Sequence, residues 1–259
     1  MASRGELGDI PDLAIFADTG WEPNSVYENI EWLQEELCFP LIKVATEGSL
    51  RDDIAAGVNT SGMPWLTIPA YMNHPDGSPA GMNWRQCTTN YKIVPILKEV
   101  KKLLGISPRS PVPQSTQIEM WLGITTDEAE RMRISPDVWI HNRYPLIDLD
   151  MSRQDCIAWF AKTYPGRHLP RSACIGCPYH SRKTWADMYE NDPDSFKDAE
   201  EIDSLLRDPS GNIAPRFANV LFLHQNRVPL REAVIADIAE NASDKSGGWG
   251  NECAGICGV

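Results

Sequence analysis

Cysteine is the residue type in this chain with the clearest capacity for chemistry. Cys174 and Cys177 form a C-x-x-C motif, and Cys87 stands just before an expected helix. Thiolates at the C-x-x-C spacing can point at one metal atom, because the glycine between them allows a tight turn. A thiolate at Cys87 would be stabilised by the N-terminus of the helix and by Arg85 and Lys92. These three cysteines are therefore candidate metal ligands.

The other cysteines divide into a pair near the end of the chain and two residues in helices. Cys253 and Cys257 form a C-x-x-x-C pair. Cys156 falls in an expected helix and Cys38 follows the acidic end of another, and both are interpreted as structural thiols. Zinc is the default metal for a lone C-x-x-C, and five candidate thiols in three separate segments leave zinc and an iron–sulfur cluster both open. A redox dithiol is disfavoured, because no strand leads into the motif.

The composition is that of a globular protein with a basic middle segment. The 259 residues are 42% hydrophobic and carry a formal net charge of −12. Residues 1–84 have 3 basic and 13 acidic side chains, residues 85–183 have 15 and 9, and residues 184–259 have 6 and 14. The middle segment contains three candidate ligands, which favours a local anion site, although solvated helix faces give the same pattern.

The apolar residues of the sequence form neither a membrane-spanning run nor the core of a signal peptide. No apolar run approaches the roughly 20 residues of a membrane-spanning helix, and the first residues lack the apolar core of a signal peptide. We therefore expect a cytoplasmic protein with no membrane segment, whose thiols are reduced or bound to metal.

Strand and helix patterns alternate along the chain and predict an α/β fold with a mainly parallel sheet. Strands are expected at 13–17, 41–45, 118–124 and 220–224, and helices at 26–37, 96–104, from 127, from 152, at 181–206 and at 229–240. Residues 46–84 are rich in Gly and Pro and predict a long irregular segment. Residues 243–259 predict a flexible tail.

Four motifs occur in an order that resembles a known family: Phe16-Ala17-Asp18-Thr19-Gly20, Cys87-Thr88-Thr89-Asn90-Tyr91-Lys92-Ile93-Val94-Pro95-Ile96, Tyr144-Pro145-Leu146-Ile147-Asp148 and Cys174-Ile175-Gly176-Cys177. From about Leu13 to His180, the chain resembles the phosphoadenosine phosphosulfate (PAPS) reductase family of the PP-loop adenine-nucleotide α-hydrolase-like superfamily, especially its phage-borne and DNA-sulfur-modification branches. The resemblance implies a Rossmann-like sheet with helices on both faces. It also implies an α/β domain at 1–180 and a helical extension with a Cys-containing tail at 181–259.

The same resemblance implies a binding site for an adenine nucleotide, either PAPS or ATP. The residues that match it are Asp18, Thr19, Gly20, Arg85, Lys92, Gly123 and Arg131. The first three would line the adenosine pocket, and the others would lie at the anionic end of the nucleotide. A strand-ending turn and a surface helix are the plainer interpretations of Asp18 to Gly20 and of Arg131.

In the adenylyl-sulfate reductases of this family, a Cys-Cys pair and a later C-x-x-C bind a [4Fe-4S] cluster. Here the first pair is reduced to Cys87, and Cys174 follows 87 residues later. The fourth ligand would be Cys257 or Cys253, or a non-protein ligand on an open iron, as in related tRNA-thiolating enzymes. Glu252-Cys253 echoes the family's Glu-Cys-Gly motif, whose cysteine forms a thiosulfonate, so Cys253 is the candidate nucleophile.

One departure from the family affects nucleotide binding. The Gly/Ser-rich phosphate loop should stand upstream of Arg4 and is missing, so either the chain is truncated or nucleotide affinity is weak. The expected activity is PAPS reductase-like reduction to sulfite, or sulfur transfer to an acceptor such as nucleic acid. A thioredoxin-like reductant or a cysteine desulfurase would be the partner, and a homodimer is compatible with the sequence. The alternative is a zinc-stabilised, non-catalytic relative that binds nucleic acid or protein.

Overall fold

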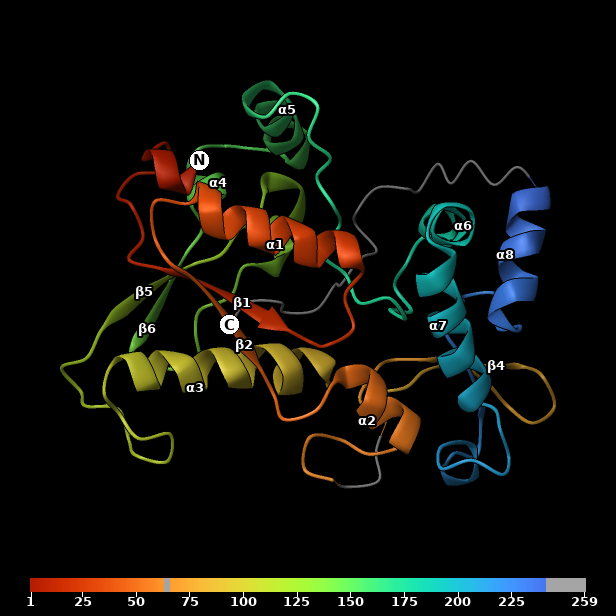
Figure 1. The fold of residues 1–259 in the computed structure, drawn as a ribbon. Helices are drawn as coiled ribbons and strands as arrows, with labels where there is room; N and C mark the ends of the chain where they lie inside the picture. Colours follow the sequence, from red (N-terminus) through yellow and green to blue (C-terminus); the bar gives the residue numbers. More distant parts are fainter. Residues whose placement is uncertain (63–65, 241–259) are drawn as a thin grey trace.

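Three small sheets form the strand framework of the computed structural model, which describes residues 1–62 and 66–240 (Figure 1). Two are parallel pairs, β1 (Ala14–Asp18) with β2 (Leu41–Ala45) and β5 (Ile118–Trp121) with β6 (Ile140–Arg143). The third is antiparallel, in the order β4 (Pro79–Met82), β3 (Tyr71–Asn73) and β7 (Val220–Phe222). The mixed α/β class is confirmed. The described strands do not form one mainly parallel sheet, and the Rossmann-like arrangement stays a prediction.

The antiparallel sheet arises where the sequence predicted an irregular segment. β3 and β4 form a hairpin whose turn contains Gly77 at a φ of 87°, a conformation that favours glycine. Helix α2 (Leu50–Ala56) lies in the same segment, where Ser49 caps its N-terminus and Gly57 ends it in the left-handed region. These elements are short, so the glycines and prolines that bound them dominated the sequence pattern.

Two helices cover the β1–β2 pair from opposite sides (Figure 1). One is α1 (Asn24–Glu36), which buries Val26 and Ile30, and the other is α3 (Val94–Leu103), which packs against both strands. A π-helical turn, η2 (Thr89–Ile93), leads directly into α3 and buries Tyr91. Wide turns of this kind occur often at functional sites. This one also carries Lys92, so the start of α3 is the part of the helix that bears on the site.

The remaining helices are short or lie toward the C-terminus: η1 (Ala2–Arg4), η3 (Thr126–Arg131), α4 (Pro145–Asp148), α5 (Arg153–Thr163), α6 (Arg182–Asn191), α7 (Pro193–Leu205), η4 (Ala214–Arg216) and α8 (Leu230–Ala239). The predicted capping box of Ser152 and Asp155 at the start of α5 is confirmed. In the part of the chain that is described, no helix combines the length and the apolar character that crossing a membrane requires.

The hydrophobic core divides into two clusters. The larger cluster joins Trp21 and Leu50 with Trp185, Phe196 and Leu230, so it contains residues from both sides of position 180. The smaller cluster packs Ile15 of β1 and Ile118 of β5 around Val100, Trp139 and Ile140. The two parallel pairs therefore share one core. The division into domains at 1–180 and 181–259 stays a prediction.

Candidate functional site: a cysteine centre at the end of β1

The turn after β1 lies directly against the C-x-x-C motif. The backbone N–H of Ile175 donates to the carbonyl oxygen of Trp21 at 2.8 Å. Asp18 closes the turn by accepting a hydrogen bond from the backbone N–H of Gly20 at 2.8 Å. A Cβ atom on Gly176 would lie 2.0 Å from the indole ring of Trp21. The glycine of the motif is therefore required for this close approach between segments that are far apart in sequence.

The sulfur of Cys174 faces two polar side chains of the same turn. Thr19 Oγ1 lies 3.3 Å from Cys174 Sγ and donates to Glu22 Oε1 at 3.2 Å. The Cys174 thiol donates to the same carboxylate oxygen at 3.6 Å. Burial raises the pKa of Glu22. Burial and then the Glu22 carboxylate raise the pKa of Cys174 well above its usual value. As it stands, the arrangement therefore holds Cys174 as a thiol.

Cys87 approaches the same place from the loop before the π-helical turn. The backbone N–H groups of Gln86 and Cys87 both donate to the carbonyl oxygen of Thr67 at 2.9 Å, which fixes this loop. Burial, and then the charge of Cys87, raise the pKa of Cys177 to about 11, so these two cysteines interact electrostatically. The structure thus brings Cys87 to the C-x-x-C motif.

Two of the predicted anion-binding cations interact with Cys87, Cys174 and Cys177 or their neighbours, a group of thiols that we call the cysteine centre. The charge of Lys92 acts on Glu22, Cys174 and Cys177. Arg85 acts on Cys177, donates a hydrogen bond to Thr88, and lies over the ring of Tyr179 at 5.6 Å. Positive charge beside thiols favours their deprotonation, which both metal binding and nucleophilic attack require.

Two further arginines, which the sequence pattern did not single out, connect Arg131 to the centre. Arg131 forms an ion pair with Glu128 at 2.6 Å and interacts with Arg153. Burial and then the charge of Arg153 lower the pKa of Arg171 to about 10, while Cys177 opposes that shift. Gly123 lies exposed after β5, with open space around the position of a Cβ. The charges of Arg131, Arg153 and Arg171 thus act on one another in turn, and Arg171 interacts electrostatically with Cys177.

His180 is a second neighbour that sequence reasoning missed, although it stands three residues after the C-x-x-C. Its Nε2 lies 2.9 Å from the carbonyl oxygen of Cys174 and 3.1 Å from that of Ile175. Both partners only accept hydrogen bonds, so this nitrogen carries a proton. Burial, followed by the charge of Arg171, lowers the pKa of His180 to about 4. A neutral imidazole therefore supports the C-x-x-C loop.

We expect acid to destabilise this loop through His180. The unfolded imidazole has a pKa of about 6.5, and the folded one has a pKa of about 4. Its contribution to stability is complete above pH 6.5 and is lost as the pH falls from there through 4. Urea midpoints at neutral pH and at about pH 5 measure the loss. His180→Asn should reduce it, and the exposed His74→Asn should not. An equal loss in His180→Asn and wild type contradicts this prediction.

We also expect the Cys177 thiol to react slowly at neutral pH. Only the thiolate is alkylated, and the pKa of about 11 keeps Cys177 protonated until the solution is strongly alkaline. Iodoacetamide labelling of the metal-free protein, followed by peptide mass spectrometry, measures the rate as the pH rises. The exposed Cys38 serves as the internal reference. Labelling of Cys177 as fast as that of Cys38 at neutral pH would refute the expectation.

The types of donor atom at the cysteine centre suit a metal ion, but the side chains are not arranged as a complete binding site. Within residues 1–62 and 66–240, no three His, Cys, Asp or Glu side chains form a group that could hold a metal ion as they stand. The donor types nevertheless suit zinc or iron, since Cys174 and Cys177 belong to one C-x-x-C loop and Cys87 interacts electrostatically with Cys177. Beside them, Glu22 Oε2 is buried and has no hydrogen-bond partner among the residues that the structure describes. Cys253 and Cys257 lie outside the described residues.

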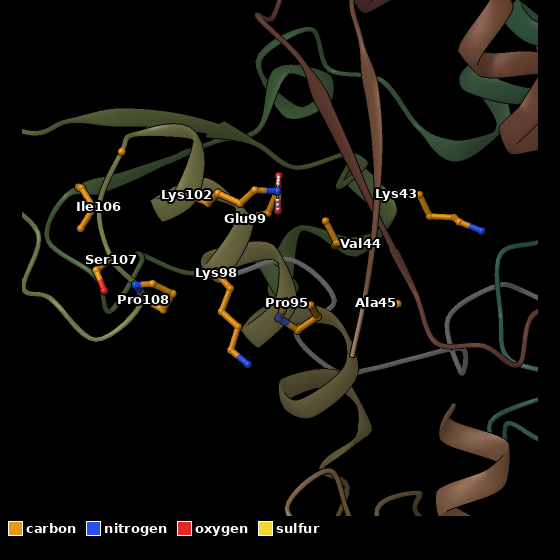
Figure 2. A pocket seen from close by; sticks show the side chains of 11 residues that line it. Lys43, Val44, Ala45, Pro95, Lys98, Glu99, Lys102, Ile106, Ser107 and Pro108 are labelled. Carbon is orange, nitrogen blue, oxygen red and sulfur yellow. Dashed lines mark hydrogen bonds and ion pairs between the residues drawn. The ribbon is translucent and has the colours of Figure 1, made fainter. Parts of the chain in front are cut away.

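A cavity of about 760 Å³ lies elsewhere, between β2, one side of α3 and the loop at 105–108 (Figure 2). None of the predicted site residues lines it. Among its lysines, Lys102 pairs with Glu99 at 3.0 Å, and Lys43 points away and pairs with Asp18 at 3.4 Å. The cavity therefore does not contain the side chains that the sequence predicts for the site.

Comparisons of the chain with protein-family models, with curated proteins and with solved structures found no match.

Proposed function

We propose that this chain carries out adenine-nucleotide-dependent sulfur chemistry of the PAPS reductase type, on a Rossmann-like fold. In this proposal, Cys87, Cys174 and Cys177 hold an iron–sulfur cluster beside a site for the anionic part of the nucleotide. Reduction to sulfite, and sulfur transfer to an acceptor such as nucleic acid, are the two outcomes that the proposal includes.

The observation that carries this proposal is the meeting of three motifs at the end of β1. The Asp18-Thr19-Gly20 turn contacts the C-x-x-C motif through Thr19 and Cys174, which are 155 residues apart in sequence. The segment that begins at Cys87 reaches the same place, as the electrostatic coupling between Cys87 and Cys177 indicates. These motifs are far apart in sequence and meet in the fold. Their convergence supports a common site of the kind that the resemblance implies.

The charges around the cysteines suit an anionic substrate. Lys92 and Arg85 act on the thiols directly, and Arg171, Arg153 and Arg131 follow one another away from Cys177. Cations held near one another repel, so an anion that binds between them is stabilised by each. We expect these residues to orient a phosphate or sulfate group. A bound cluster would supply electron transfer or a site for sulfur.

Purification without oxygen tests the proposal. Wild type is expected to contain iron and acid-labile sulfide and to absorb visible light, whereas Cys174→Ser should lose all three. Cys156→Ser, which removes a thiol of α5, is the matched control and should keep them. Release of sulfite from PAPS, or a PAPS- or ATP-dependent transfer of sulfur to nucleic acid, is then measured. Folded wild type without iron and sulfide contradicts the proposal, and zinc alone favours the non-catalytic alternative.

A further inference from the structure

Two tyrosine rings with arginines over them lie beside Cys177. Arg227 Cζ lies 5.4 Å from the centre of the Tyr71 ring, and Arg85 Cζ lies 5.6 Å from that of Tyr179. Burial and then the charge of Tyr179 raise the pKa of Tyr71. The charges of Arg227 and Cys177 also act on the Tyr71 hydroxyl. The two pairs of ring and guanidinium are therefore neighbours of each other and of the thiol.

The antiparallel sheet presents Tyr71 on its outer face. The neighbouring Met72 packs against the larger core cluster, and successive side chains of a strand point to opposite faces. Tyr71 is therefore turned away from that cluster and stays partly exposed. Arg227 reaches the ring from the loop after β7, where its φ of 54° is uncommon for a residue other than glycine. Backbone strain of this kind is often found at binding sites.

Trp84 adds a third aromatic ring and is 82% exposed. It follows β4, whose Met82 pairs with Tyr71 of β3. Asn83 fixes the start of its loop by donating to the carbonyl oxygen of Ile68 at 3.0 Å, and the hydrogen bonds before the π-helical turn fix the other end. The indole is thus held out to solvent on an ordered loop, which lowers the entropy that a partner must overcome on binding.

Five residues make up this surface, which we call the aromatic face: Tyr71, Trp84, Arg85, Tyr179 and Arg227. They carry two positive charges and no negative one, in a chain whose formal net charge is −12. The Nε of Arg227 is buried and has no hydrogen-bond partner among the described residues, so it is available to an acceptor. The aromatic face therefore suits a partner that brings both flat rings and anionic oxygens.

We propose that the aromatic face binds a single-stranded nucleic acid beside Cys177. Unpaired bases stack on Trp and Tyr rings and on guanidinium planes, and arginines bind the phosphates between them. A duplex hides the faces of its bases, so it offers this surface only phosphates. An acidic protein segment would match the charge but not the three rings. The inference deepens the proposed function, on which it rests, by naming the partner that approaches the thiols.

Fluorescence anisotropy with the full-length protein and a labelled strand of about 15 nucleotides tests the aromatic face. Wild type should bind the strand more tightly than a duplex of the same sequence. Trp84→Leu, which keeps an apolar side chain, should weaken binding by about 5-fold or more, the loss expected for one stacked base. Trp84→Phe keeps a ring and should retain most of the affinity. Val138→Ala, at another exposed apolar position, is the matched control.

Arg227→Gln tests the phosphate contact through the dependence of binding on salt. Loss of one contact to a single strand should reduce the slope of log affinity against log salt by about 0.7. Arg109→Gln, which removes an exposed arginine from the loop after α3, should leave the slope unchanged. Wild-type behaviour of both Trp84→Leu and Arg227→Gln overturns the inference. So does equal affinity for the duplex, or equally strong displacement of the strand by a poly-glutamate peptide.

Iron, sulfide and sulfite measurements on the same wild-type protein separate this inference from the proposed function. A protein that contains iron and releases sulfite from PAPS, but does not bind the strand, overturns the inference and leaves the proposed function standing. A protein that binds the strand through Trp84 and Arg227, but contains neither iron nor sulfide, confirms the aromatic face and contradicts the proposed function.

Discussion

Replacing Asp203 with alanine is expected to lower the free energy of unfolding by about 3–5 kcal/mol, the range for removal of one partner from a buried ion pair. Asp203 is 1% exposed and accepts backbone hydrogen bonds from Leu223 and Leu230, both at 2.9 Å. It also pairs with Arg207 at 2.6 Å. Alanine would leave two buried N–H groups and a guanidinium without this partner. Urea unfolding measures the loss.

Two variants make the Asp203 prediction specific. Asp203→Asn keeps one acceptor oxygen in place, so its loss of stability should be smaller than that of Asp203→Ala. Glu190→Ala removes an exposed carboxylate from the neighbouring helix α6 and should leave the urea midpoint unchanged. The hydrogen bonds of Asp203 join α7 to Leu223, directly after β7, and to the start of α8. Because β7 pairs with β3, the prediction also concerns the sheet that precedes the Cys87 loop. Equal stability of Asp203→Ala and wild type would show that these bonds contribute nothing.

Replacing Gly176 with alanine is expected to disturb stability and metal binding together. The new methyl group would overlap the indole of Trp21, which is 3% exposed and whose Nε1 donates to Asp198 at 2.5 Å. Because that ring has no room to withdraw, the C-x-x-C loop must shift, and overpacking of this kind costs about 1–3 kcal/mol. Thermal unfolding measures the first effect, and zinc titration of Cys174 and Cys177 measures the second.

Gly123 provides the control for this substitution. A Cβ at Gly123 meets nothing within 4 Å, so Gly123→Ala should unfold at the temperature of wild type. If Gly176→Ala lowers the unfolding temperature and Gly123→Ala does not, the loss comes from the contact with Trp21 and not from replacing a glycine as such. If Gly176→Ala keeps both wild-type stability and wild-type zinc affinity, the contact between Trp21 and the C-x-x-C loop has no importance for the site.

The elements that local patterns predict well are those with a clear periodicity and a cap. The runs that became β1 and β2 and the helices α1, α3 and α5 were predicted close to their observed bounds. The hairpin of β3 and β4 was missed because its strands are only 3 and 4 residues long. β3 is held on its other side by β7, which is about 150 residues later, and such pairing leaves no trace in a local pattern.

The cysteines could be singled out by their residue type, whereas the side chains around them could not. Cys87, Cys174 and Cys177 were identified because clustered thiols have few roles where no secretion signal is expected. Glu22 was missed because, in an acidic segment, a buried carboxylate reads like any surface charge. His180 and Arg171 were missed because their contacts depend on how the C-x-x-C loop folds back on itself. Burial and orientation, which decide these roles, come only from the fold.

The claim on which the account depends is that thiols far apart in sequence share one place. A short reagent that bridges two thiols, applied to the metal-free protein and followed by peptide mass spectrometry, tests this directly. We expect a bridged product that joins Cys87 to Cys177 or Cys174, and we expect prior loading with zinc to prevent it. The contradicting result is a bridge only between Cys174 and Cys177. In that case Cys87 reacts singly, and zinc does not protect Cys87 from the reagent.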